Sequence, residues 1–218
     1  MSGHRYWKMQ GTRRSPLVYV KQDEKGRLMP FDPARYGPAL ADLLQAPDLM
    51  PLGPGSPNPS ARPRLQALTP EQVCAPKPVR DRDMAACCLA GLWLYHNYLD
   101  ESHTISQSID TPSGSYWHGL LHRREPDFSN AKYWFRGVGR HPVFEPLAGA
   151  AAELAAESKL APLPAFLTQR LSWDPSAFID LCETATAQGP AWEMLCRRVQ
   201  QHEWQLLFDH CYRHALDG

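Results

Sequence analysis

The sequence lacks any hydrophobic run long enough to cross a membrane. Its longest uninterrupted apolar stretch, Ala85–Tyr95, has 11 residues, whereas a membrane-spanning helix needs about 20. The basic residues near the N-terminus are followed by no apolar segment of the kind that a secretory signal peptide contains. We therefore expect a soluble, cytoplasmic protein with no membrane partner.

Sequence motifs of several common enzyme classes are also missing. The chain has no Gly-x-Ser-x-Gly elbow and no glycine-rich phosphate loop, which disfavours serine hydrolases and nucleotide-dependent enzymes. Its six cysteines follow no metal-finger or redox spacing. Cys87 and Cys88 lie in the apolar run, so we expect buried, reduced thiols rather than nucleophiles.

Charge and proline are unevenly distributed, although the formal net charge is zero. Residues 1–80 hold 12 Lys and Arg against 6 Asp and Glu, whereas residues 81–218 hold 11 against 17. Thirteen of the 21 prolines precede residue 81, and proline is excluded from the interior of helices and central strands. We therefore expect residues 47–80 to form an extended arm without helices. The basic residues of this arm are scattered, which disfavours binding to nucleic acid.

The predicted fold is mainly α, a single helical domain with a proline-rich N-terminal arm. In the N-terminal segment, 1–46, the apolar residues at 17–20 and 27–29 flank a polar turn at 23–26, which predicts a small β-hairpin. In the third segment, 81–218, capping residues, prolines and glycines delimit a series of helices. The helices are expected near 84–99, 113–125, 130–138, 146–160, 175–188 and 190–215.

Histidines at helical spacing suggest a metal site. If the helix that begins near Met84 continues past Asp100, then His96, Asp100 and His103 lie on one face of it. His118 and His122, four residues apart on the next predicted helix, have a spacing that often holds a divalent metal. The predicted metal ligands are His96, Asp100, His103 and His122. Because no complete metal-binding motif accompanies them, a metal-free polar cleft built from the same residues is the favoured interpretation.

The stretch from Tyr116 to His141 interleaves charge with aromatic rings. It holds five Lys or Arg, three His and two acidic residues among six aromatic ones. In a binding cleft, aromatic rings supply flat apolar walls while Arg and His fix a polar or anionic ligand. The alternative is that Arg123, Arg124 and Glu125 form structural ion pairs above a packed aromatic core.

Part of the chain resembles a family of microbial proteins of about this length. The resemblance extends over roughly residues 85–145. The motifs that carry it are Leu94–His96, Leu99–His103, Tyr116–Gly119, His122–Asp127 and Asn130–Trp134. The family carries no assigned function, so the resemblance implies no catalytic role. It makes a chance clustering of these residues less attractive.

Two functions fit these observations. The first is a hydrolase or lyase acting on a small polar or anionic substrate, with His118 or His122 as general base and Asp100 or Glu125 orienting the imidazole. With a metal present, a bound water would be the nucleophile. The second is a non-catalytic helical module that binds an anionic ligand or an acidic partner segment. In both, the expected ligand-binding side chains are Trp117, Arg123, Arg124, Asn130, Lys132, Tyr133 and Trp134.

Overall fold

The computed structural model describes residues 19–22, 28–45, 49–168 and 172–217, and this part of the chain is mainly helical. Two short strands, β1 (Tyr19–Gln22) and β2 (Leu28–Pro30), pair antiparallel. The turn predicted at 23–26 lies outside the described residues. None of the described helices is both long enough and apolar enough to span a membrane.

The remaining elements follow in chain order. They are η1 (Pro33–Tyr36), α1 (Pro38–Ala41), α2 (Arg62–Ala67), α3 (Pro70–Val73), α4 (Arg82–Tyr95), α5 (Leu99–Ser106), α6 (Pro112–Arg124), α7 (Phe128–Val138), α8 (Phe144–Ser158), η2 (Ala165–Leu167), α9 (Pro175–Gln188) and α10 (Pro190–Asp217). Asp81, Asp127 and Asp174 cap α4, α7 and α9, and each accepts a hydrogen bond from a backbone amide in the first turn of its helix.

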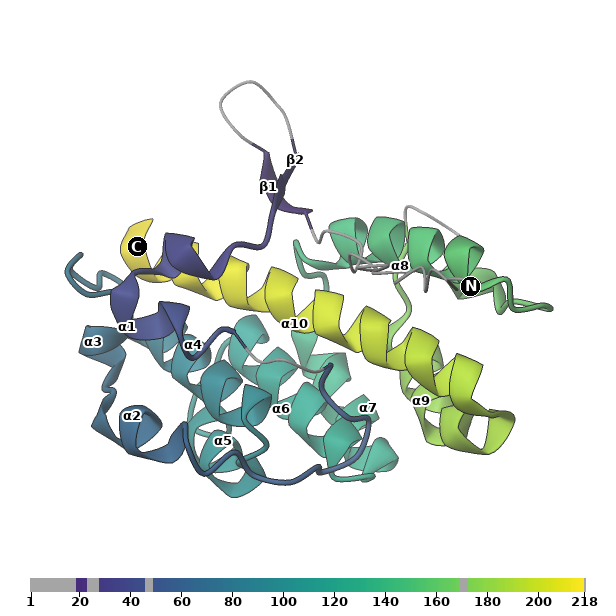
Figure 1. Ribbon diagram of the computed structural model, residues 1–218, viewed down its shortest axis with the longest axis horizontal. Coiled ribbons are helices and arrows are strands. Elements are labelled where there is room, and N and C mark those ends of the chain that lie inside the picture. The colour runs from purple at the N-terminus through teal and green to yellow at the C-terminus, as the bar shows by residue number, and fades with distance from the viewer. Residues whose placement is uncertain (1–18, 23–27, 46–48, 169–171, 218) are drawn as a thin grey trace, which may run out of the picture.

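The longest helix, α10, organises the core. It crosses the molecule with α4–α7 on one side and α8 on the other (Figure 1), and it packs directly on α4, α8 and α9. Trp204, near its middle, is fully buried and donates a hydrogen bond from Nε1 to the carbonyl of Gly91, at 2.9 Å. The ring of Trp117 packs against Gly91. A Cβ at residue 91 would lie 2.7 Å from this indole ring, so glycine fits there without a clash. These buried aromatic contacts fix α4, α6 and α10 to one another.

The helix predicted over 84–99 ends earlier than expected. Residue Asn97 adopts φ 63°, and α4 stops at Tyr95 before α5 begins at Leu99. The left-handed conformation suits Asn better than most residues. The sequence did not indicate this break, because the helices on both sides of it contain buried side chains.

The proline-rich segment departs from the prediction of an arm without helices. Its first part, residues 49–59, is a strap without helix or strand, but α2 and α3 follow within it. The prediction was wrong because both helices place proline in their first turn, where the missing amide hydrogen would have no helical partner anyway. The carbonyls of Leu49 and Met50 accept hydrogen bonds from Arg197, and that of Pro51 accepts one from Gln200. The strap is thus fastened to α10 through its own carbonyl groups.

Candidate functional site

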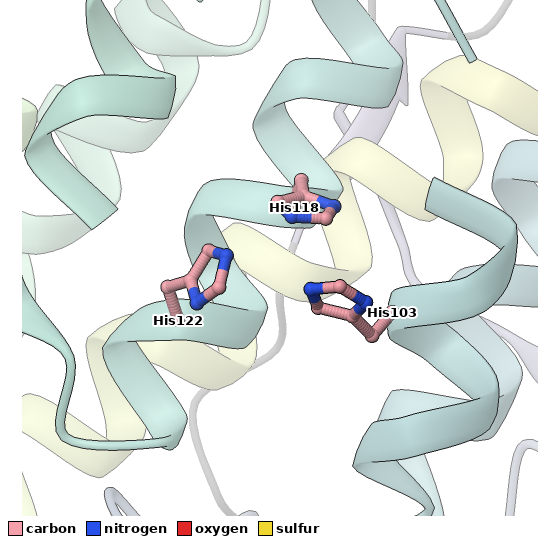
Figure 2. Close-up of side chains that lie close together, drawn as sticks. All are labelled: His103, His118 and His122. Atoms are coloured by element: carbon pink, nitrogen blue, oxygen red, sulfur yellow. The ribbon is translucent and has the colours of Figure 1, made fainter. Parts of the chain in front are cut away.

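Three histidines converge between α5 and α6. His103 comes from α5, while His118 and His122 come from successive turns of α6. The ring centroid of His103 lies 4.6 Å from that of His118 and 5.4 Å from that of His122, and the latter two lie 4.7 Å apart. One nitrogen from each ring lies within 4.8 Å of the others, so the three residues could hold a metal ion (Figure 2). We call these side chains the triple-histidine cluster.

The local sequence explains why these rings meet. Thr111 caps α6 by accepting a hydrogen bond from the amide of Gly114, and Pro112 begins the helix. Four-residue spacing then places His118 and His122 on one face of α6. The break at Asn97 resets the helical phase, so that α5 directs His103 toward α6 rather than in line with His96.

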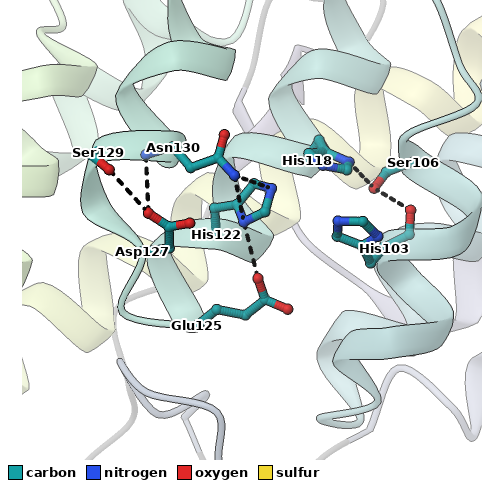
Figure 3. Close-up of polar contacts among 8 residues, drawn as sticks. All are labelled: His103, Ser106, His118, His122, Glu125, Asp127, Ser129 and Asn130. Carbon is teal, nitrogen blue, oxygen red and sulfur yellow. Dashed lines mark hydrogen bonds and ion pairs between the residues drawn. The ribbon is translucent and has the colours of Figure 1, made fainter.

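A second layer of polar groups holds two of the rings. Ser106 Oγ lies 2.9 Å from His118 Nδ1, and Glu125 Oε2 lies 3.0 Å from His122 Nδ1. Asn130, on α7, places Nδ2 3.1 Å from His122 Nε2 (Figure 3). Two members of the cluster are therefore oriented by fixed partners on α5, α6 and α7.

Two of the three rings, those of His118 and His122, are held neutral near physiological pH. His118 and His122 are buried, whereas His103 is half-buried and opens the cluster toward solvent. Burial, together with the neighbouring imidazoles of His122 and His103, lowers the pKa of His118 to about 3. Burial also lowers the pKa of His122, although the Glu125 carboxylate opposes that shift. Neutral imidazoles keep a free lone pair, which can accept a proton or bind a metal ion.

Two of the predicted metal ligands lie elsewhere. His96 is buried as expected, but its Nε2 lies 2.9 Å from the carbonyl of Leu43 and its Nδ1 lies 3.1 Å from Asn58 Nδ2. Asp100 is exposed and lines a groove of about 670 Å³ beside the strap, outside the cluster. The predicted set of His96, Asp100, His103 and His122 is therefore wrong in its first two members. The third member of the cluster is His118, which was predicted as a general base but not as a metal ligand.

Both arginines predicted to bind substrate are buried structural groups. Arg123 is 1% exposed and forms an ion pair with Glu203 on α10, with Nη2 and Oε2 2.5 Å apart. Arg124 is 0% exposed and donates hydrogen bonds to the carbonyls of three residues and to Asn97 Oδ1. The three carbonyls belong to Gly53, Pro54 and Leu94. Arg123 thus forms a structural ion pair, as the alternative predicted, whereas Arg124 is a structural group that makes hydrogen bonds but no ion pair with any described residue.

The aromatic residues divide between core and surface. Trp117 is fully buried against Gly91, so it cannot line a cleft. Trp134 packs on the ring of His118, with centroids 4.0 Å apart, and Tyr133 is 61% exposed. Lys132 forms an ion pair with Asp180 on α9. Of the predicted ligand-binding residues, only those on α7 lie beside the cluster or are exposed to solvent.

A hollow of about 320 Å³ is lined by residues of α6 and α7, near the cluster. The two helices run antiparallel, because Asn130 faces His122 and Trp134 faces His118. The hollow begins at Trp134, which packs on His118. Its lining residues are Ser115, Tyr133, Trp134, Arg136 and Gly137.

Sequence reasoning passed over Arg136 as a binding residue, and it missed Ser106 as well. Arg136 lies over the ring of Tyr133, with its Cζ atom 5.4 Å from the ring centroid, and it makes no ion pair with any described residue. Its spacing of three residues from Tyr133 on a helix was the available signal. For Ser106 no such signal existed, because its role depends on how α5 and α6 pack.

Comparison of the chain with protein-family models, with curated proteins and with solved structures finds no match.

Proposed function

We propose that the protein is a hydrolase or lyase that acts on a small polar or anionic substrate at the triple-histidine cluster. The observation that carries this proposal is the convergence of three imidazoles in one place, with a carboxylate bonded to one of them. A buried histidine outside the cluster, His96, instead bonds to the carbonyl of Leu43 and to the side chain of Asn58 and meets no other imidazole in the described residues. His103 is only half-buried, so part of its side chain is accessible to a small substrate.

His122 is the best placed general base. Its lowered pKa keeps the imidazole neutral at physiological pH, and the neutral form is the one that accepts a proton. When His122 takes a proton from water or substrate, the Glu125 carboxylate 3.0 Å away stabilises the imidazolium that forms. Glu125 thereby orients the imidazole, a role that was predicted for either Glu125 or Asp100.

The hollow along α6 and α7 supports a polar or anionic substrate. Trp134 contacts His118 and also lines the hollow, so a molecule seated there lies beside the cluster. Arg136 supplies a cation, Ser115 a hydroxyl and Tyr133 an exposed aromatic face. Such a combination suits a compound that carries a carboxylate or phosphate on a small planar body.

Turnover of chromogenic esters and phosphate esters tests this proposal. We expect the purified protein to hydrolyse at least one of 4-nitrophenyl acetate, 4-nitrophenyl phosphate and bis(4-nitrophenyl) phosphate, or to eliminate from a β-hydroxy acid. The substitution His122→Asn should lower kcat by about 100-fold or more, since a positioned general base contributes roughly 10²–10⁴. His214→Asn, at an exposed histidine of α10, is the matched control and should leave turnover unchanged.

Two results would contradict the proposal. One is turnover that survives His122→Asn unchanged. The other is saturable binding of these compounds with no product formed, which would instead support the non-catalytic binding module.

A further inference from the structure

We propose that the triple-histidine cluster is a binding site for one divalent transition-metal ion of the zinc type, with a coordination position left open. The inference deepens the proposed function, because it names the cofactor of the same centre and so rests on the same site. Metal binding is nevertheless measured without any substrate. The two ideas can therefore fail separately.

The distances suit a metal ion after a small adjustment. In a tetrahedral site with metal–nitrogen bonds of about 2.0–2.1 Å, the ligand nitrogens lie about 3.3 Å apart. The three ring nitrogens here all lie within 4.8 Å of one another. We expect small rotations of the side chains to close the remaining gap.

Several ring nitrogens have no competing partner. Among the described residues, neither ring nitrogen of His103 takes part in a hydrogen bond, and the same holds for His118 Nε2. Buried or half-buried nitrogens normally find a hydrogen-bond partner. Three imidazoles packed together with free acceptor nitrogens form the environment that an ion would stabilise.

The outer partners point the remaining nitrogens inward. In metal sites, a ligating histidine commonly uses its second nitrogen to bond a carboxylate or another polar group, which fixes the ring. Ser106 Oγ meets His118 at Nδ1, and Glu125 Oε2 meets His122 at Nδ1, so that Nε2 of each ring is the ligand nitrogen (Figure 3). Asn130 Nδ2 lies near His122 Nε2 and would be displaced by the ion.

The surrounding charge favours a cation. Glu125 and Asp127 follow α6 directly, and the Glu125 carboxylate reaches the cluster. The neighbouring positive charge of Arg123 is paired with Glu203, and the guanidinium of Arg124 points to the strap. The charged side chains around the three rings therefore do not repel a divalent cation.

The donor set selects the class of ion. Imidazole nitrogens suit zinc, copper, iron and nickel, whereas calcium and magnesium prefer oxygen ligands. Three protein ligands leave the fourth position of a tetrahedral ion to water, and zinc lowers the pKa of that water to about 7. If such a water lost one proton to bulk solvent, it would become a hydroxide. This step requires no oxidant or reductant.

Zinc titration of the full-length protein tests the site. The protein is expressed without a histidine tag, stripped with a chelator and titrated with Zn²⁺ by calorimetry, with bound metal counted by elemental analysis. We expect one ion per chain. Substitutions His103→Ala, His118→Ala and His122→Ala should each weaken binding by more than the about 10–100-fold that losing an outer partner costs, while His214→Ala leaves it unchanged.

The fold of each variant is checked by circular dichroism. His103→Ala is the decisive variant, because His103 is half-buried and its ring makes no hydrogen bond with any residue that the structure describes. No stoichiometric binding, or binding that His103→Ala leaves intact, would overturn the metal site. One bound ion without turnover would uphold the site and count against the proposed function. Turnover that persists in the chelator-stripped protein would uphold the function and overturn the ion as its cofactor.

Discussion

Arg123 shows at the scale of one residue how a buried charge can be mistaken for a ligand-binding group. Its guanidinium bonds to Glu203, lies over the ring of Phe178 and has Gln200 close by. Glu203 also accepts a hydrogen bond from Tyr116, at 3.0 Å. Charge alone could not distinguish this arrangement from an anion site, because its partners lie about 80 residues away on α10.

Replacing Arg123 by Ala should therefore destabilise the fold. Removing one partner of a buried ion pair strands the other and costs about 3–5 kcal/mol. The melting temperature should fall on the order of 10 °C, since each kcal/mol lowers it by about 2–4 °C in a chain of this size. Urea unfolding measures the loss. Arg136→Ala, at an exposed arginine without an ion pair, is the control and should change stability by less than about 0.5 kcal/mol. Equal stabilities for the two variants would contradict this account of Arg123.

The outer partners of the cluster give a second prediction. Ser106→Ala and Glu125→Gln each remove a group that orients a histidine, so both should weaken zinc binding by about 10–100-fold. Calorimetry on the stripped protein measures this. Ser108→Ala is the matched control, because the hydroxyl of Ser108 bonds to the carbonyl of Ile105 and does not face the cluster. Unchanged affinity in both Ser106→Ala and Glu125→Gln would mean that the rings are not held through their Nδ1 atoms.

At the scale of the elements, the sequence predicted best those helices whose ends carry local signals. α9 begins at Pro175 and ends at Gln188 as predicted, between the cap Asp174 and Gly189, and α7, capped by Asp127, ends at Val138 as predicted. Such caps act within one turn, so one stretch of sequence is enough to find them. The break after α4 has no such signal. It depends on Arg124, which bonds to the carbonyl of Leu94 and to the side chain of Asn97 from a distant helix.

The candidate site was predicted in part for the same reason. The pairing of His118 with His122 follows from helical spacing alone, and so does the contact of His122 with Glu125, three residues further on. His103 was grouped with His96 and Asp100 because the break was not foreseen. Only the packing of α5 on α6 brings it to His118.

Asn97 tests the importance of the break. Asn97→Gly and Asn97→Ala both lose the bonds of the side chain to Arg124 and to the carbonyl of Ser56. Glycine tolerates φ 63°, whereas alanine there is strained by roughly 1–2 kcal/mol. Asn97→Ala should thus be less stable than Asn97→Gly by about 1 kcal/mol in urea unfolding. If the alanine variant is the more stable of the two, the chain at this point is not held in a left-handed conformation.

At the scale of the whole molecule, histidine burial predicts sensitivity to acid. Four histidines outside the cluster have a lowered pKa, caused chiefly by burial. They are His96, His141, His202 and His210, with the pKa of His141 at about 4 and that of His210 at about 3. An unfolded chain binds protons at these residues below about pH 6.5, whereas the folded protein does not. Stability is therefore complete above pH 6.5 and is lost as the pH falls toward 4.

The expected loss is steep. Each histidine kept neutral contributes up to about 1.4 kcal/mol per pH unit within this window. Urea unfolding at pH 7.0, 6.0 and 5.0, with a chelator present to exclude metal effects, measures the slope. His202→Gln should make it shallower, because it removes one of the four groups. Constant stability between pH 7.0 and 5.0 would show that these histidines titrate normally in the folded protein.

The most direct test of the central claim is the position of zinc in a crystal of the loaded protein. Anomalous diffraction at the zinc absorption edge locates the ion without reference to any assay. The account predicts one strong peak per chain, about 2.0–2.1 Å from a nitrogen of each of His103, His118 and His122. A peak elsewhere on the chain, or no peak at the cluster in crystals grown with excess zinc, would contradict it.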